Sequence, residues 1–220
     1  MNIGAIIPCY NEGDIIEYTV KALRELGAFD EIIVVDDGSV DDTFIKARDC
    51  GVKCIRLDKN RGKGNAVREG LKCIDTDIIA LIDGDVGSTA GEMSKVLAPV
   101  IEGRADVAIA VFPKSNKKGG FGFVKGLTRR GLKLLTGKTV DSALSGQRVY
   151  KRELIEKLWI PDGYGMEFAM TAETLKLGCK IAEVEVNMSH KATGRSFKDF
   201  LHRGRQFKDI FKTIIVEALR

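Results

Sequence analysis

Ile78-Ile79-Ala80-Leu81-Ile82-Asp83-Gly84-Asp85 is an apolar run of strand length followed directly by two carboxylates. A short run of this kind, bounded by turn residues, is typical of a buried strand. Carboxylates at the end of a dry strand are costly without a partner, and a divalent cation is one such partner. Asp83 and Asp85 share a face if the chain stays extended, and Gly84 leaves room for a close ligand. The alternative is an Asp-Gly turn that only ends the strand.

The composition is that of an ordinary globular protein. The 220 residues include 44% hydrophobic and 30% charged residues, which suits one α/β domain with a full core. A net charge of +4 is too small to indicate a nucleic-acid partner. The charge is unevenly placed, because residues 191–220 hold eight Lys/Arg and three Asp/Glu. The basic character therefore belongs to the C-terminal segment.

The cysteines and the apolar runs indicate a cytoplasmic protein. An odd number of cysteines without a CxxC pair fits buried, reduced thiols better than a disulfide framework. No signal peptide opens the sequence, and no apolar stretch approaches the roughly 18 residues of a spanning helix. We expect a protein that is soluble or at most peripheral at the inner face of a membrane. The cysteines are Cys9, Cys50, Cys54, Cys73 and Cys179.

Strand-like runs alternate with helical patterns over the first 112 residues. This alternation predicts a mostly parallel sheet flanked by helices, with ligands beyond the carboxyl ends of the strands. Pro8 is expected to stop the first strand, because proline cannot donate to a sheet ladder. Strands are expected at 3–7, 31–35, 52–57, 78–82 and 106–112. Helices are expected at 15–26 and 92–101, with one further helix that begins at residue 41 and another that runs to residue 71.

The pattern changes after residue 112. Glycines and lysines in 113–126 predict a polar loop. A strand or turn with one arginine on its buried side is expected at 145–150, and a late strand at 181–186. Helices are expected at 123–135, from 163 onward and from 197 onward, the last one with an apolar stripe and basic residues elsewhere.

Two loops at the expected strand ends suit a nucleoside. The first runs from Pro8 and offers the aromatic ring of Tyr10 and the polar groups of Asn11 and Glu12. The second carries Asp37, whose carboxylate can accept hydrogen bonds from a base or ribose. The alternatives are a plain strand-to-helix connection for the first loop and a capping role for Asp37.

A third loop suits a diphosphate. Lys59, Arg61 and Lys63 alternate with Gly62 and Gly64, so cations and accessible backbone lie together. The loop is neither a GxxxxGK[ST] nor a GxGxxG motif. The alternative is a solvated basic loop.

Taken together, four segments resemble the family 2 glycosyltransferases, which have the GT-A fold. The resemblance covers about the first half of the chain and implies a nucleotide-diphospho-sugar donor. It places Pro8, Tyr10, Glu12 and Asp37 around the nucleoside, and makes Asp83 and Asp85 the DxD pair that holds Mn²⁺ or Mg²⁺ and the diphosphate. The segments are Ile7-Pro8-Cys9-Tyr10-Asn11-Glu12, Val34-Val35-Asp36-Asp37-Gly38-Ser39-Val40-Asp41-Asp42-Thr43, Asn60-Arg61-Gly62-Lys63-Gly64 and Asp83-Gly84-Asp85.

The second half resembles the family more loosely. Ser145-Gly146-Gln147-Arg148 is similar to the SGFR-type segment of dolichyl-phosphate mannosyltransferases, which implies a substrate-binding Arg148. Gly163-Tyr164-Gly165-Met166-Glu167 looks like the GYGxE segment of glucosyl-3-phosphoglycerate synthases. Glu167 is then the candidate base for a hydroxyl acceptor. The alternative is a first-turn glutamate favoured by the helix dipole.

The same resemblance implies two later contacts. A histidine completes the metal shell in the related enzymes, and His190 can play that part, with Arg195 facing the diphosphate. The alternative for His190 is a simple surface histidine. A nitrogen ligand would favour manganese over magnesium.

We therefore expect a single glycosyltransferase domain over 1–220. It comprises a nucleotide-sugar-binding half (1–112), an acceptor-binding half (113–195) and a basic C-terminal helix (196–220). The acceptor stays open between a polyprenyl phosphate and a small hydroxyl compound. The C-terminal helix can lie on an anionic membrane, dock on the domain or form a homodimer.

Two rival functions are open. A nucleotidyltransferase can use a similar sheet, but its glycine-rich GxGTR-like loop is missing here. A non-catalytic nucleotide-sugar-binding module is the second rival. The presence of Asp83, Asp85 and Glu167 speaks against it.

Overall fold

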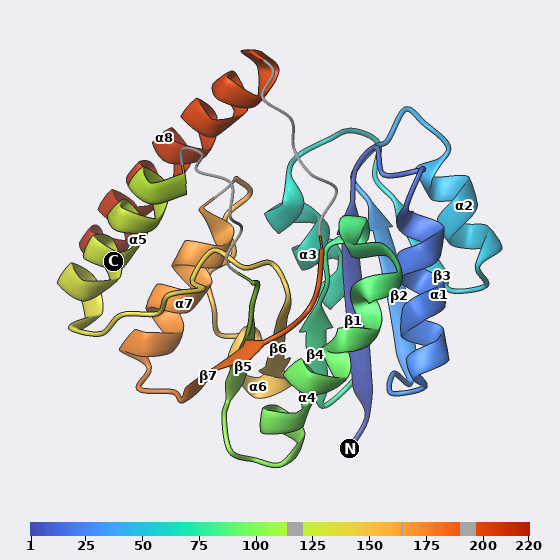
Figure 1. Cartoon of the computed structure of the whole chain (residues 1–220), viewed down its shortest axis with the longest axis horizontal. Helices are drawn as coiled ribbons and strands as arrows, with labels where there is room; N and C mark the ends of the chain where they lie inside the picture. Colours follow the sequence, from blue (N-terminus) through green and yellow to red (C-terminus); the bar gives the residue numbers. More distant parts are fainter. Residues whose placement is uncertain (114–120, 164, 190–196) are drawn as a thin grey trace.

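One seven-stranded sheet forms the centre of the protein in the computed structural model (Figure 1). The structure describes residues 1–113, 121–163, 165–189 and 197–220, with only the helical backbone for 121–123 and 197–207. The strands are β1 (Ile3–Cys9), β2 (Glu31–Asp36), β3 (Lys53–Arg56), β4 (Ile78–Leu81), β5 (Val107–Val111), β6 (Arg148–Lys151) and β7 (Ile181–Glu185). The helices are α1 (Ile16–Leu26), α2 (Thr43–Asp49), α3 (Lys63–Leu71), the 3₁₀ helix η1 (Gly84–Glu92), α4 (Met93–Ile101), α5 (Phe121–Thr136), α6 (Arg152–Ile155), α7 (Met166–Lys176) and α8 (Phe197–Leu219).

The strand order is β3-β2-β1-β4-β6-β5-β7. All neighbouring pairs are parallel except those of β6, which runs antiparallel to both β4 and β5. The predicted mostly parallel α/β fold is confirmed. The position of β6 between two strands that are consecutive in the sequence was not predicted, and it brings the residues before β6 to the end of β4.

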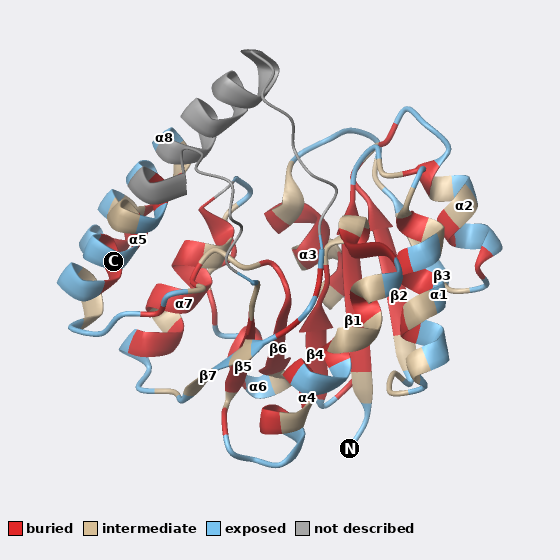
Figure 2. Ribbon diagram, viewed as in Figure 1, coloured by how far each residue is buried: buried red, intermediate tan, exposed pale blue. Residues whose placement is uncertain are grey.

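Two hydrophobic cores cover the two faces of the sheet. Side chains alternate along β1, so Ala5 and Ile7 join one core while Ile6 joins the other. Helices α1 and α4 supply the first core, whereas α3, α5 and α7 supply the second. Figure 2 shows the strands as a buried centre between partly exposed helices.

Helix α1 follows its sequence pattern closely. Ile16, Val20 and Leu23 are buried at helical spacing, and the other side of the helix faces solvent. Gly27 ends it at φ 65° and donates its N–H to the Arg24 carbonyl. This left-handed conformation suits glycine. Both ends of the helix agree with the sequence prediction to within one residue.

Pro8 does not stop β1, contrary to the prediction. The strand runs on to Cys9, with Pro8 opposite Val35 of β2. Pairing with β4 ends earlier, at Ile6 opposite Leu81. Pro8 therefore lies where the strand has only one neighbour, and its missing N–H costs no ladder hydrogen bond.

The five cysteines are free thiols, as expected from the sequence. Cys9 and Cys50 are buried, but Cys73 is exposed, so the expectation of apolar surroundings fails there. Among the helices that the structure describes, none combines the length and the apolar character needed to cross a membrane.

Candidate active site at the carboxyl ends of the strands

The loops after β1 and β2 are tied to each other. The Asn11 N–H donates to Ser39 Oγ at 2.9 Å, and Asn11 Oδ1 accepts the Val40 N–H at 3.0 Å. The Glu12 N–H donates to Thr43 Oγ1 at 2.8 Å. Asn11 adopts φ 53°, which asparagine tolerates better than most residues. Asn11 thus acts within the protein as the link between two loops. Tyr10 beside it is 43% exposed and free to present its ring.

Asp37 holds the basic loop in place. Its carboxylate accepts the Arg61 N–H at 3.1 Å and the Gly62 N–H at 2.7 Å. Burial raises the pKa of Asp37, and these backbone hydrogen bonds offset only part of that rise. Gly38 (φ 75°) is needed beside it, because a Cβ there would lie 2.8 Å from the Lys59 carbonyl carbon. The carboxylate predicted to bind a nucleoside is therefore also the anchor of the diphosphate loop.

The basic loop is packed against the segment before α7. The Gly64 N–H donates to the Asp162 carbonyl at 3.4 Å, and a Cβ on Gly62 (φ 97°) would collide with that same oxygen. The side chains of Lys59 and Arg61 are exposed at the loop surface. Glycine has no side chain, so the loop backbone can stay this close to the Asp162 segment. The backbone N–H groups and the cations of the loop then lie together.

Lys63 bridges two carboxylates that lie far apart in the sequence. Its Nζ atom lies 2.8 Å from Glu167 Oε1 and forms a closer ion pair with Asp83 Oδ1. Burial alone would lower the pKa of Lys63, but the negative charges of the two carboxylates raise that pKa by more than burial lowers it. The lysine therefore stays charged. Gly146 makes room for this group, because a Cβ there would collide with both Asp83 and Lys63. A cation therefore already faces the first aspartate of the DxD pair.

Gln147 fixes the orientation of Asp83 and was not singled out by the sequence. Its Nε2 donates to Asp83 Oδ2 at 2.7 Å, and its Oε1 accepts the Asp83 N–H at 2.9 Å. The glutamine side chain is fully buried, so both hydrogen bonds are shielded from water. The only sequence signal for Gln147 was its place in the SGQR segment, next to an arginine that is the more obvious candidate ligand.

Arg148 does not reach the site, which corrects the prediction of a substrate-binding arginine. It is fully buried, and Nη1 donates to Tyr150 Oη at 3.1 Å and to Thr171 Oγ1 at 2.9 Å. Nε and Nη2 donate to the carbonyls of Ser145 and Ala143. In a strand the side chains of neighbours point to opposite faces, so Gln147 takes the site and Arg148 the core.

Thr19 shapes the turn that carries the DxD pair. Its hydroxyl donates to the Gly84 carbonyl at 2.7 Å and accepts the Gly87 N–H at 2.8 Å. Gly87 adopts φ 57°, which interrupts η1. A buried threonine on the apolar side of α1 was the available signal for this contact. The turn thereby keeps Asp83 and Asp85 at the end of β4.

Glu12 adds a third carboxyl group to this edge. Its Oε2 atom is buried and has no hydrogen-bond partner among the described residues. Burial, together with the negative charges of Asp85 and Asp83, raises the pKa of Glu12 to about 9. A Cβ on Gly84 would collide with Oε2, so glycine is required between the two aspartates. The three acids repel one another, and this part of the site attracts a cation.

The predicted residues fall into three groups. Glu12, Asp37, Gly62, Lys63, Asp83, Asp85 and Glu167 come together at the strand ends, together with Pro8, Tyr10, Asn11 and Lys59 of the adjoining loops. Arg148 lies in the core. His190 and Arg195 lie outside the described residues.

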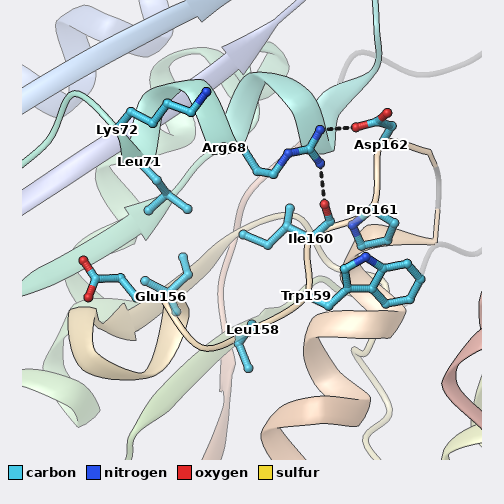
Figure 3. Close-up of a pocket in the computed structure, with 10 residues that line it drawn as sticks. Arg68, Leu71, Lys72, Glu156, Leu158, Trp159, Ile160, Pro161 and Asp162 are labelled. Atoms are coloured by element: carbon cyan, nitrogen blue, oxygen red, sulfur yellow. Dashed lines mark hydrogen bonds and ion pairs between the residues drawn. The ribbon is translucent and has the colours of Figure 1, made fainter. Parts of the chain in front are cut away.

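A cavity of about 720 Å³ lies next to this site but does not contain its carboxylates (Figure 3). Arg68 and Leu71 of α3, with Lys72 just after it, form one wall, and the segment 155–162 with Trp159 forms the other. Figure 3 shows Arg68 bonded to Asp162 and to the Ile160 carbonyl. The chemistry lies instead with the polar groups at the strand ends, since Arg68 and Asp162 of the cavity are paired with each other.

The comparison with protein families decides the identity of the chain. The family model described as Glycosyl transferase family 2 matches residues 5–159, which include β1 to β6 and every described carboxylate of the site except Glu167. The chain belongs to glycosyl transferase family 2. Four of the five described site carboxylates thus lie within the region that this family shares.

Curated relatives in family 2 are moderately similar. Glycosyltransferase AglJ of Haloferax volcanii is 30% identical over 81% of this chain and 60% of its own length. A dolichol-phosphate mannosyltransferase of Pyrococcus furiosus is 28% identical over 89% of this chain and 59% of its own length. The chain therefore spans about three fifths of these two relatives.

A solved structure of similar fold covers almost the whole chain. Glucosyl-3-phosphoglycerate synthase of Mycobacterium tuberculosis, in complex with Mn²⁺, uridine diphosphate and glucosyl-3-phosphoglycerate, matches with a TM-score of 0.84 and 25% identity. The match covers 99% of this chain and 80% of the synthase. The GT-A fold predicted from the sequence is confirmed.

The donor atoms at the edge fit a divalent metal. Within the described residues, no three His, Cys, Asp or Glu side chains are arranged to hold a metal ion by themselves. Mg²⁺ commonly needs only one or two carboxylates, with substrate phosphates supplying further oxygens. Asp83 and Asp85 meet that requirement, and their negative charges add to the effect of burial in raising the pKa of Glu12.

Proposed function

We propose that this family 2 chain transfers a sugar from a nucleotide-diphospho-sugar in a reaction that depends on Mn²⁺ or Mg²⁺. The observation that carries the proposal is the meeting of Asp83, Lys63 and Glu167 at the carboxyl end of β4. Cation, metal-binding carboxylate and candidate base then lie within one side-chain length of each other. The Mn²⁺ and uridine diphosphate named for the mycobacterial synthase agree with this donor class.

The donor is held by three loops in this proposal. Tyr10 offers its exposed ring to the base, beside Pro8, Asn11 and Glu12. Asp37 keeps the loop of Lys59, Gly62 and Lys63 in place, so that its cations and N–H groups face the diphosphate.

The chemistry lies in the charge of the leaving group. Breaking the sugar–phosphate bond leaves a nucleoside diphosphate, and a bound metal would stabilise the negative charge that develops on it. Asp83 and Asp85 would hold that metal. Lys63, already charged and aimed at this edge, supplies further positive charge. His190 as a third metal ligand and Arg195 at the diphosphate belong to the proposal as well.

The acceptor we propose first is a polyprenyl phosphate. Curated relatives named as a dolichol-phosphate mannosyltransferase and as an undecaprenyl-phosphate transferase support this class. A phosphate acceptor needs no base, so Glu167 would then position Lys63 and the sugar. A small hydroxyl compound is the second candidate, because the matching synthase structure contains glucosyl-3-phosphoglycerate. In that case Glu167 would accept the proton of the attacking hydroxyl.

Product analysis tests the function. The full chain is incubated with common uridine and guanosine diphospho-sugars and Mn²⁺, with and without undecaprenyl phosphate. Release of nucleoside diphosphate supports a glycosyltransferase. Formation of nucleoside triphosphate and sugar 1-phosphate, seen only when pyrophosphate is added, would identify a nucleotidyltransferase. If the chain binds the nucleotide but forms neither product, it is a non-catalytic nucleotide-sugar-binding module and the proposal is wrong.

Calorimetry tests the metal site separately. Asp85→Asn should abolish the part of uridine diphosphate binding that depends on Mn²⁺, since the carboxylate charge is lost. Asp49→Asn, an exposed residue at the end of α2, is the matched control and should bind as the wild type does. Unchanged metal-dependent binding in Asp85→Asn would refute its role as a ligand.

A further inference from the structure

In the described part of helix α8, residues 208–219, apolar side chains lie on two faces, and the protein covers one of them. Ile210, Thr213 and Glu217 are buried on the inner face, where α8 packs against α5 and α7. Lys176 of α7 pairs with Glu217 at 2.7 Å. Docking on its own domain was one of the three placements that the sequence left open, and the described part of the helix adopts it, but docking leaves the opposite face uncovered.

The uncovered face carries a regular apolar row. Phe211, Ile215 and Leu219 follow one another at intervals of four residues, so they line one side of the helix. They are 50%, 47% and 83% exposed. Leu134 on the neighbouring helix α5 is also exposed. Burying these side chains in water-free surroundings would be favourable, by roughly 25 cal/mol for each Å² of apolar area.

Basic side chains lie beside this apolar row, whereas the acidic side chains of the same segment are partly or fully buried. Within residues 208–220 the two acidic side chains are the half-buried Asp209 and the buried Glu217. Residues 124–136 of α5 contain no acid. Two of the cations are paired with acids, since Arg129 lies 3.8 Å from Asp141 and Arg220 lies 3.2 Å from Glu173. The exposed cations are Lys125, Arg129, Arg130 and Lys133 of α5 and Lys208, Lys212 and Arg220 of the C-terminal segment.

We infer that the outer face of α8, with the exposed cations of α5 beside it, docks on the surface of an anionic lipid bilayer. Phe211, Ile215 and Leu219 enter the boundary between headgroups and acyl chains, and the lysines and arginines contact the headgroups. This surface goes beyond the proposed donor and acceptor, because it would bind lipid whichever acceptor the enzyme uses.

Charge decides between this occupant and a second copy of the chain. In a two-fold dimer the same patch faces itself, so the cations of one copy would meet those of the other. An anionic bilayer offers the opposite charge and an apolar layer beneath it. The exposed apolar row also distinguishes the patch from a site for nucleic acid, which needs cations but no aliphatic row.

Vesicle flotation with the full chain tests the surface. The protein is mixed with vesicles of phosphatidylcholine alone or of phosphatidylcholine and phosphatidylglycerol in equal parts. We expect binding to the anionic vesicles only, and weaker binding at high salt because salt screens exposed charges. A chain that floats with neither vesicle type would overturn the inference.

Two variants locate the contact. Phe211→Ser with Ile215→Ser should abolish flotation, and Lys208→Gln with Lys212→Gln should weaken it on the order of tenfold. The matched controls are Ile45→Ser on α2, where the side chain is 49% exposed, and Lys21→Gln with Lys95→Gln. Both controls should float normally.

Far-ultraviolet circular dichroism of each variant separates lost binding from lost folding. If the serine variant folds and still floats, or if its only change is the loss of a dimer in sedimentation, the lipid surface is refuted.

Discussion

Gln147 and Asp83 exchange two hydrogen bonds, one in each direction, although 64 positions separate them in the sequence. The amide oxygen of Gln147 accepts the Asp83 backbone N–H, and its amide nitrogen donates to the carboxylate. Such a pair sets both the position and the rotamer of Asp83 before any ligand arrives. Partners of this kind typically change metal affinity by 10- to 100-fold when they are removed.

Gln147→Met should therefore weaken Mn²⁺-dependent binding of uridine diphosphate by roughly tenfold, because the side chain keeps its length but loses both hydrogen bonds. Calorimetry measures the affinity directly. Thr174→Val, which removes a buried hydroxyl bonded to the Met170 carbonyl in α7, is the control for general damage to the core. Equal affinity of Gln147→Met and wild type would show that Asp83 needs no such support.

Lys63 compensates two carboxylates in the metal-free protein. Lys63→Met should lower the free energy of unfolding by about 2 kcal/mol, because Asp83 and Glu167 lose their shared cation. Added Mn²⁺ without nucleotide should then raise Tm more in the variant than in the wild type, since the ion replaces the lost charge. Thermal unfolding with and without Mn²⁺ checks this.

The control for Lys63 is Lys53→Met, whose lysine pairs with Glu31 at 3.2 Å on the surface. Surface pairs contribute little, so its Tm should hardly change. A Lys63→Met protein with wild-type Tm at every metal concentration would contradict the compensating role.

The raised pKa of Glu12 predicts that stability falls as pH rises from about 4.5 to about 9. The folded state keeps a proton up to about pH 9, whereas the unfolded state releases it above about 4.5. The folded state binds more protons in this window, so the free energy of unfolding falls as pH rises through it. The slope should be on the order of 1 kcal/mol per pH unit.

Urea unfolding at several pH values, with a chelator present, measures this slope. Glu12→Gln cannot ionise and should flatten it, while Glu25→Gln, an exposed glutamate near the end of α1, should not. A Glu12→Gln protein with the full wild-type slope would place the responsible group elsewhere.

Glu167 distinguishes the two acceptor classes. Gln at this position still accepts a hydrogen bond from Lys63 but cannot take up a proton. With a polyprenyl phosphate acceptor, Glu167→Gln should reduce kcat less than tenfold. A hydroxyl acceptor would need the base, and its loss should cost about a hundredfold or more. Transfer of radiolabelled sugar to undecaprenyl phosphate and to a phosphorylated alcohol decides between the two outcomes.

The strand-end loops could be predicted because their geometry follows from a general rule. Parallel strands place their carboxyl ends at one edge, so the residues after β1, β2 and β4 had to meet there. The helical spacing of apolar residues around Val20 and Val67 and the glycine at position 27 also indicated helices and a helix end from short stretches of sequence. For these reasons the fold class and the meeting of these loops at one edge of the sheet could be predicted from the sequence.

The second half was less readable because its contacts are not local. Nothing in the segment 145–151 announces an antiparallel strand inserted between β4 and β5. Without that register, Gln147 and Arg148 are equally good candidates, and a charged arginine is the natural choice. The structure reverses that choice. Strand pairing across many residues is set by packing, which periodicity alone cannot supply.

The central place of β6 has a consequence for the growing polypeptide. When β5 leaves the ribosome, its neighbour in the finished sheet has not yet been synthesised, and β4 presents a bare edge on that side. The sheet is complete only when β6, which is synthesised later, inserts between β4 and β5. Such non-local steps are slow. We expect β6 insertion to limit the folding rate, so that Asp83 gains its glutamine partner only when the last stage of folding is over.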